Sequence, residues 1–132
     1  MKLNLLSEVR TQLRSQLELL RPIIIAAAQR VYDTWEPDDE YDDFSGGGIC
    51  DAISSEISSI LAGAGIDSTE GGQDGDDHSF VIAYDRRFAY VVDIHHSTYE
   101  SGGGYSWQKI PGVIFQPEDV QIFEVDRPDW IE

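Results

Sequence analysis

A chain of 132 residues can build one domain with a hydrophobic core and is too short for two ordinary ones, so we treat residues 1–132 as a single domain. The net charge of −16 at pH 7 should repel a phosphate backbone, which argues against direct nucleic-acid binding unless the protein imitates a nucleic acid. No run of about 18 apolar residues is present, so no membrane-spanning segment is expected.

The chain contains one cysteine, Cys50, which cannot form a disulfide within the chain. The first residues lead into charged positions rather than into the uninterrupted apolar core of a secretion signal. Nothing in the sequence therefore requires an oxidising compartment, and we expect a cytoplasmic protein.

Residues 1–35 carry an apolar stripe at spacings of three or four residues, which predicts a long amphipathic helical segment. Pro22 lies inside this segment and has no backbone N–H, so either the helix kinks there or a second helix begins. Packing on the rest of the domain is favoured, and a homodimer formed through the stripe is the alternative. The stripe consists of Leu6, Val9, Leu13, Leu17, Leu20, Ile24, Ala28 and Val31.

A second helix is predicted directly after the glycines at 46–48. Apolar residues recur at helical spacing from Ile49 to Ala64, and Gly63 and Gly65 are typical helix terminators. The acidic segment 35–45 before this helix and the polar, glycine-containing segment 67–77 after it are both expected to be loops. The later loop is a candidate cover for a site.

The segments Ser79–Tyr84 and Phe88–Ile94 are rich in aromatic and β-branched residues, which predicts two antiparallel strands joined by a short turn. With Arg86 and Arg87 in the turn, Phe80 would lie opposite Asp93. Further strands are expected over Val113–Phe115 and Val120–Val125. The elements together predict an α+β fold, in which N-terminal helices and the helix after Gly48 pack on a small antiparallel sheet within residues 46–125.

Cys50, His78 and Asp93 are the candidate catalytic residues. A thiol in the first turn of a helix lies near the positive end of the helix dipole and near free amide donors, which favours a nucleophilic thiolate. Asp93 is a carboxylate in an otherwise apolar strand and needs a partner if it is buried. In the expected register His78 and Asp93 are diagonal neighbours on one sheet face. The predicted roles are attack on a carbonyl by Cys50, proton transfer by His78 and orientation of the imidazole by Asp93.

This order of residues resembles the transglutaminase-like branch of the papain-like cysteine enzymes. The resemblance covers only the segment from Gly48 to Ile94, where family members usually carry tryptophan in place of Phe80 and often proline in place of Ile94. It rests on Gly48 and Cys50 at a helix start, His78-Ser79-Phe80 at the opening of a strand and Asp93-Ile94 on the next strand. The glutamine that completes the oxyanion hole of papain-type enzymes has no counterpart before Cys50, so the second oxyanion donor is unassigned.

The resemblance implies a papain-like core and a thiol-dependent hydrolase or acyltransferase. Its substrate would be an amide, ester or thioester carbonyl of a peptide, a protein or a small molecule, and it would need no cofactor or metal. The backbone amide of Cys50 would help to bind the oxyanion. The candidate oxyanion and substrate-loop residues are Gly48, Ile49, Phe80, Tyr105 and Trp107. Tyr99 is a further aromatic residue beside the glycine-rich segment 102–104, and for the aromatic residues around this segment core packing or loop anchoring is the alternative role.

Two alternatives remain open. Cys50, His78, Asp93 and His95 are all potential zinc ligands, although their spacing matches no strong zinc pattern. The other alternative is a non-catalytic acidic binding or inhibitor protein, such as an inactive papain-like domain or a nucleic-acid mimic, which the charge alone supports. His95 and its neighbour His96 follow the predicted strand and are more typical of a hairpin end than of a catalytic site.

Overall fold

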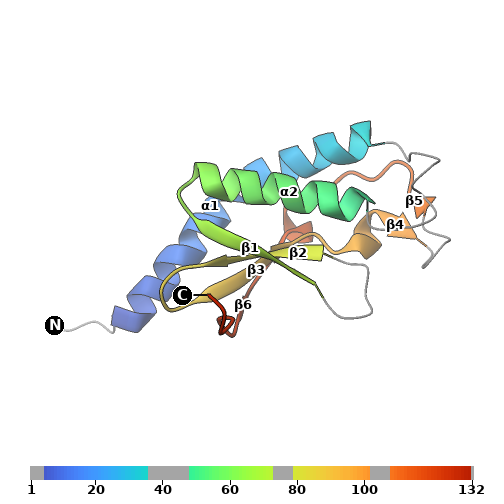
Figure 1. The fold of residues 1–132 in the computed structure, drawn as a ribbon. Helices are drawn as coiled ribbons and strands as arrows, with labels where there is room; N and C mark the ends of the chain where they lie inside the picture. Colours follow the sequence, from blue (N-terminus) through green and yellow to red (C-terminus); the bar gives the residue numbers. More distant parts are fainter. Residues whose placement is uncertain (1–4, 36–47, 73–78, 102–107, 132) are drawn as a thin grey trace.

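The computed structural model of the protein describes residues 5–35, 48–72, 79–101 and 108–131. In these residues two helices cover one face of a four-stranded antiparallel sheet with strand order β1-β2-β3-β6 (Figure 1). The helices are α1 (Leu5–Thr34) and α2 (Gly48–Gly63), and the strands of the sheet are β1 (Asp67–Gly72), β2 (Ser79–Tyr84), β3 (Ala89–Asp93) and β6 (Gln121–Val125). A small second sheet pairs β4 (Glu100–Ser101) with β5 (Gln108–Lys109). The predicted α+β class with a small antiparallel sheet is confirmed.

The apolar stripe of α1 faces the core of its own domain. Leu13, Leu17, Ile24 and Ala28 are buried in the main hydrophobic cluster, and Leu20 and Val31 pack against it. By contrast Leu19, on the outer side of the helix, is 78 % exposed. No helix in the described part of the chain is both long enough and apolar enough to cross a bilayer.

The helix α1 continues through Pro22, so of the two alternatives given for this proline, the start of a second helix is wrong. Pro22 lies on the exposed side of α1. Solvent can therefore hydrogen-bond the carbonyl that loses its amide partner at this turn, which lets the helix tolerate the proline. The N-terminal helical segment is one element rather than two.

Arg21 connects α1 to the segment before β6. Its guanidinium donates hydrogen bonds to the backbone carbonyls of Pro117, at 2.7 Å, and of Val120. The same guanidinium donates to both carboxylate oxygens of Glu18, one turn earlier, at 2.8 and 3.0 Å. The N-terminal helix and the C-terminal strand are thus held together directly.

The helix α2 begins and ends as its sequence predicts. It starts at Gly48, which places Cys50 in its first turn. At the other end Gly65 adopts a positive φ of 78°, and the amides of Gly65 and Ile66 donate to the carbonyls of Ala62 and Leu61. This is the Schellman arrangement, in which glycine ends a helix because it enters the left-handed region without strain.

The strands β2 and β3 pair in the predicted register, with Val81 opposite Val92 and Tyr84 opposite Ala89. The turn between them is closed by Asp85, whose carboxylate accepts hydrogen bonds from the amides of Arg87, at 2.8 Å, and Phe88, at 2.7 Å. The predicted two-residue turn is confirmed, and with it the side-chain alternation along both strands.

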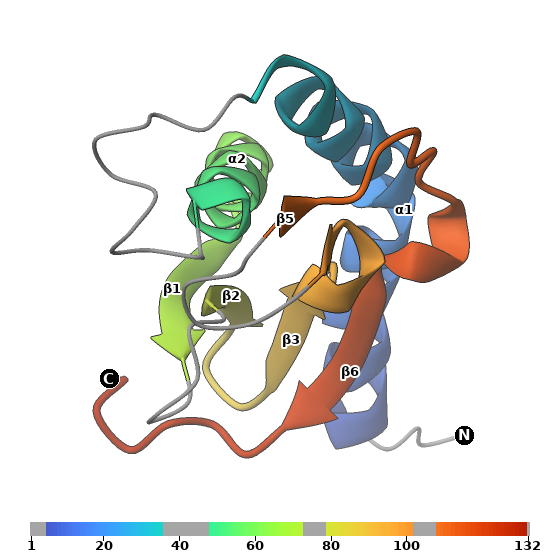
Figure 2. The ribbon, with the colours of Figure 1, turned by 90° about the vertical axis from the view of Figure 1, so that its right-hand side faces the viewer.

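The two faces of the sheet have different partners. Val81, Ala83, Tyr90 and Val92 face the helices and belong to the main core. A second cluster lies on the opposite face and contains Phe80, Ile82, Tyr84, Ala89, Val91 and Val125. Figure 2 shows both helices on one side of the sheet and the segment after β6 on the other. Arg127 holds this segment, because it donates to the carbonyls of Asp85 and Ile131 at 2.8 and 2.7 Å.

The segment that was predicted to be a loop at 67–77 forms the edge strand β1 over Asp67–Gly72, and residues 73–78 lie outside the described part of the chain. Pairing with β2 overrides its polar composition. Gly71 pairs with Phe80, and a Cβ at position 71 would lie 2.8 Å from the Phe80 ring. Only glycine leaves room for the ring at this point in the strand.

The prediction of a strand over Val113–Phe115 is also wrong. The backbone there bonds to side chains of α1 instead of to a neighbouring strand. The Val113 amide donates to the Tyr32 hydroxyl at 3.1 Å, and the Phe115 amide donates to Gln29 Oε1 at 2.8 Å. The Gln29 side chain also donates to the Val113 carbonyl at 3.0 Å, so the segment meets its hydrogen-bonding needs without joining the sheet.

Candidate functional site

Cys50 lies in the first turn of α2, at the end of the helix nearest β4 and β5 (Figure 1). Its neighbour Ile49 and the residues one and two turns later, Ile53 and Ile57, anchor this end of the helix in the main core. The Cys50 side chain is 2 % exposed. The thiol is therefore held firmly at a helix N-terminus, where the dipole favours negative charge.

Asp93 is the last residue of β3 and is 6 % exposed, so its carboxylate is buried. It shares the sheet face of Ala89 and Val91, which is the face away from the helices. Because β2 and β3 are antiparallel, the last residue of β3 and the first residue of β2 lie at the same end of the two strands. His78 precedes the first residue of β2 in the chain and lies outside the described residues.

Tyr99 is close to both Cys50 and Asp93. Its side chain is fully buried, and its hydroxyl interacts with the Cys50 thiol, with Asp93 and Glu100 also close enough to act on it electrostatically. Burial raises the pKa of the Tyr99 phenol far above its ordinary value of about 10, and the neighbouring Cys50, Glu100 and Asp93 raise it further. The phenol therefore remains protonated across the physiological pH range.

Several contacts fix the position of Tyr99. Its ring makes an edge contact with the Phe115 ring, with centroids 6.0 Å apart and planes at 89°. Its amide donates to the His96 carbonyl at 3.1 Å, and its own carbonyl accepts from the Ile110 amide at 2.8 Å. Among the described residues, the Tyr99 hydroxyl has no partner that meets the geometry of a standard hydrogen bond.

Glu100 is a second buried carboxylate at this end of the molecule, and the sequence gives no signal for it. It is 6 % exposed and opens β4, where it pairs with Lys109 of β5. Cys50, Asp93 and Glu100 each take part in polar or electrostatic interactions. Burying a carboxylate without a compensating partner costs several kcal/mol of folding free energy. Two buried carboxylates, Asp93 and Glu100, therefore make this end of the molecule a candidate for a functional site.

Of the candidate oxyanion and substrate-loop residues, those that the structure describes lie in different surroundings. Ile49 is fully buried in the core, which makes it an anchor for the start of α2. Phe80 is half-buried on the sheet face away from the helices, where its ring covers Gly71. Gly48 is the first residue of α2. Tyr105 and Trp107 lie outside the described residues.

The adjacent histidines have a local structural role. His95 precedes the short 3₁₀ turn at His96–Thr98, and its Nδ1 accepts from the Ser97 amide at 3.2 Å and contacts the Ser97 hydroxyl at 2.8 Å. The two imidazole rings contact each other with centroids 4.3 Å apart and planes tilted by 35°. Among the described residues no three metal-binding side chains are grouped, although His78 of the suggested zinc set lies outside them.

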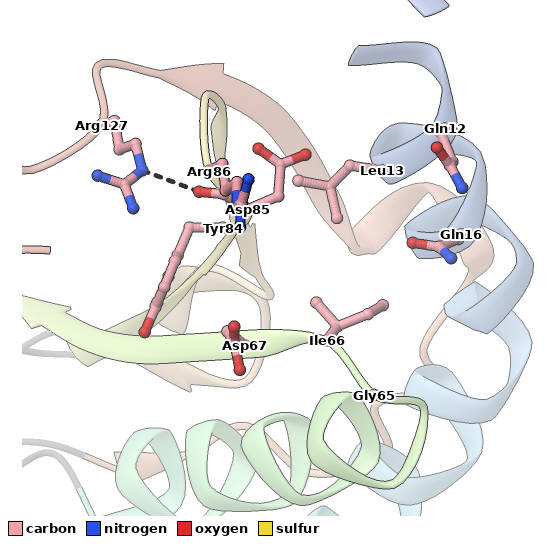
Figure 3. A pocket seen from close by; sticks show the side chains of 10 residues that line it. All are labelled: Gln12, Leu13, Gln16, Gly65, Ile66, Asp67, Tyr84, Asp85, Arg86 and Arg127. Carbon is pink, nitrogen blue, oxygen red and sulfur yellow. Dashed lines mark hydrogen bonds between the residues drawn. The ribbon is translucent and has the colours of Figure 1, made fainter. Parts of the chain in front are cut away.

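A polar pocket of about 350 Å³ lies at the opposite end of α2 from Cys50 (Figure 3). It is formed by the N-terminal half of α1, the end of α2, the β2–β3 turn and Arg127. A helix rises about 1.5 Å per residue, so some 20 Å of α2 separate the pocket from the thiol. The pocket is distinct from the Cys50 site. Its lining residues are Gln12, Leu13, Gln16, Gly65, Ile66, Asp67, Tyr84, Asp85, Arg86 and Arg127.

No family model matches the chain, and neither a curated protein nor a solved structure matches it. The chemistry of the site has to be inferred from its own residues. These are a thiol at a helix N-terminus, a buried phenol beside it that stays protonated at physiological pH, and two buried carboxylates.

Proposed function

We propose that this protein is a thiol-dependent hydrolase or acyltransferase that acts on an amide, ester or thioester carbonyl through Cys50, His78 and Asp93. One observation carries the proposal. Cys50 at the start of α2 and Asp93 at the end of β3 come from distant parts of the sequence, both are buried, and both lie close enough to Tyr99 to influence it electrostatically. Such a mechanism requires a nucleophile and a carboxylate that orients the general base.

His78 completes the proposed triad from its place in the chain. It immediately precedes Ser79, the first residue of β2, and β2 begins at the end of the sheet where β3 finishes. Val81 pairs with Val92 in these antiparallel strands. The residues before Val81 therefore lie at the same end of the strand pair as Asp93, which follows Val92. The carboxylate of Asp93 would orient the imidazole, and the imidazole would hold the proton of the thiol.

The proposed reaction has two halves. The Cys50 sulfur attacks the carbonyl carbon, the carbonyl electrons move to oxygen, and the backbone amide of Cys50 donates to that oxyanion. His78 gives the proton from the thiol to the leaving amine, alcohol or thiol as the bond breaks. Water or an acceptor amine then attacks the thioester and returns Cys50, with His78 taking the proton of the attacking group.

The burial of Cys50 favours a second candidate function. A thiol that is 2 % exposed can be an inert part of the core, in which case the net charge of −16 points to a non-catalytic acidic binding or inhibitor protein. The two functions make opposite predictions for one property, the chemical reactivity of the thiol in the folded protein.

The deciding experiment is the rate of alkylation by iodoacetamide between about pH 4 and about pH 9, because Cys50 is the only cysteine and every label reports on it. The proposed enzyme should react fast well below pH 8.5, where a free thiol titrates, and His78→Ala should abolish this acid-side reactivity. His95→Ala is the matched control, since His95 caps a 3₁₀ turn and should leave the rate unchanged. A rate that rises only near pH 8.5 in the parent, or no labelling unless the protein is denatured, would reject the enzyme and support the binding protein.

A further inference from the structure

We propose that Tyr99 is a positioning residue for Cys50, whose hydroxyl donates a hydrogen bond to the sulfur when the thiol ionises. This inference rests on the proposed thiol chemistry and adds a fourth residue to it. The sequence offers no glutamine in the few residues before Cys50 to stabilise negative charge at the site, and the structure places a phenol beside the thiol instead.

The first argument is geometric. The Tyr99 side chain is fully buried and fixed by the edge contact with Phe115 and by backbone hydrogen bonds on both sides of the residue. Its hydroxyl interacts with the Cys50 thiol but makes no standard hydrogen bond to any residue that the structure describes. A buried hydroxyl without a full partner is unfavourable, so a negative charge on the adjacent sulfur would satisfy it.

The second argument is electrostatic. The charged or titratable groups that act on the phenol are Cys50 from α2, Asp93 from β3 and Glu100 from β4. Together with burial they raise its pKa far above 10, so the hydroxyl stays protonated throughout the range in which thiols ionise. A protonated phenol beside a thiolate acts as a donor. Hydrogen bonds from neutral donors to anions are about twice as strong as those between neutral groups.

Tyr99→Phe tests this role because it removes the hydroxyl and keeps the ring packed against Phe115. The pH at which alkylation of Cys50 reaches half its maximal rate should rise by about one unit in this variant, which corresponds to a roughly tenfold loss of thiolate below that pH. Tyr32→Phe is the matched control. The Tyr32 ring makes a similar edge contact with Phe115 at 5.7 Å, but its hydroxyl bonds to the backbone of Ile110 and Val113.

An unchanged or lowered midpoint in Tyr99→Phe, or an equal rise in Tyr32→Phe, would overturn the role of Tyr99. A second measurement covers the case in which the variant does not fold or Cys50 cannot be labelled. In the folded parent, the ¹³Cζ resonance of Tyr99 should shift as Cys50 ionises, and Cys50→Ala should remove that shift. A resonance that behaves identically in both proteins would also overturn it.

The two proposals fail separately. The midpoint of the parent and its dependence on His78 test the enzyme, whereas the difference between the parent and Tyr99→Phe tests the hydrogen bond. A shift in Tyr99→Phe with a parent midpoint near pH 8.5 would support the contact and reject the enzyme.

Discussion

The ring of Phe80 covers Gly71, its partner on the neighbouring strand. A Cβ at position 71 would lie 2.8 Å from Cε2 of Phe80 and 3.3 Å from Cδ1 of Ile82. Gly71→Ala should therefore lower the free energy of unfolding by about 1–3 kcal/mol, because the ring must leave its position. Urea unfolding at equilibrium measures this change.

Gly63→Ala is the control for that substitution. A Cβ at position 63, in the last residue of α2, would meet no atom within 4 Å, so we expect no loss and a small gain. The double variant Gly71→Ala/Phe80→Leu should lose less than the sum of the two single changes, since a smaller side chain at 80 relieves the clash. Strict additivity would show that the Phe80 ring does not constrain position 71.

Two leucines on α1 test which face of the helix is covered. Leu17 is fully buried and Leu19 is 78 % exposed. Leu17→Ala should cost about 2–5 kcal/mol of unfolding free energy through the cavity that it leaves, and Leu19→Ala should change it by no more than about 0.5 kcal/mol. Thermal unfolding at several protein concentrations distinguishes the two faces. A large, concentration-dependent loss in Leu19→Ala would mean that a second copy covers the outer face.

The carboxylate of Asp85 fixes the β2–β3 turn through the amides of Arg87 and Phe88. Asp85→Ala leaves both donors without this partner and should destabilise the protein by about 0.5–2 kcal/mol, by analogy with the loss of a helix N-cap. Asp85→Asn keeps an acceptor oxygen and should recover most of the loss. Equal losses in both variants would show that the negative charge matters more than the hydrogen bonds.

Stability in alkali should report on Tyr99. Its pKa in the folded protein is raised above the value of about 10 that it has when unfolded, so its protonated form stabilises the fold fully below about pH 10. Above that pH the unfolded chain releases the phenol proton and the folded chain keeps it. The free energy of unfolding of the parent should then fall more steeply than that of Tyr99→Phe, by about 1.4 kcal/mol per pH unit. Parallel curves in urea titrations between pH 8 and 11 would contradict the burial of the phenol.

Much of the fold was predictable because its signals are local. Glycines 46–48 and the apolar period after them predict where α2 begins, and Cys50 in the first turn follows from this. The β2–β3 register follows from a two-residue turn between apolar runs. The burial of Asp93 also follows from its place in an apolar strand.

The remaining elements depend on partners that are distant in the sequence. The segment Asp67–Gly72 is polar and contains two glycines, so its composition predicts a loop. It is a strand because it pairs with β2 along its whole length, and the Phe80 ring fits against it because residue 71 is glycine. Val113–Phe115 has a strand-like composition, but Gln29 and Tyr32 of α1 take its hydrogen bonds. In the site, Glu100 shows no period or motif, and its burial follows from tertiary packing alone.

The contact between Arg21 and the carbonyls of Pro117 and Val120 has a consequence for the order of folding. The meander from α2 to β3 is continuous in the chain and can form while the protein is being synthesised, because its contacts are local. The apolar side of α1 gains its last partners only when β6 leaves the ribosome. Until then the part of this apolar side that α2 does not cover stays exposed on the nascent chain, and at this stage such surfaces recruit chaperones or aggregate.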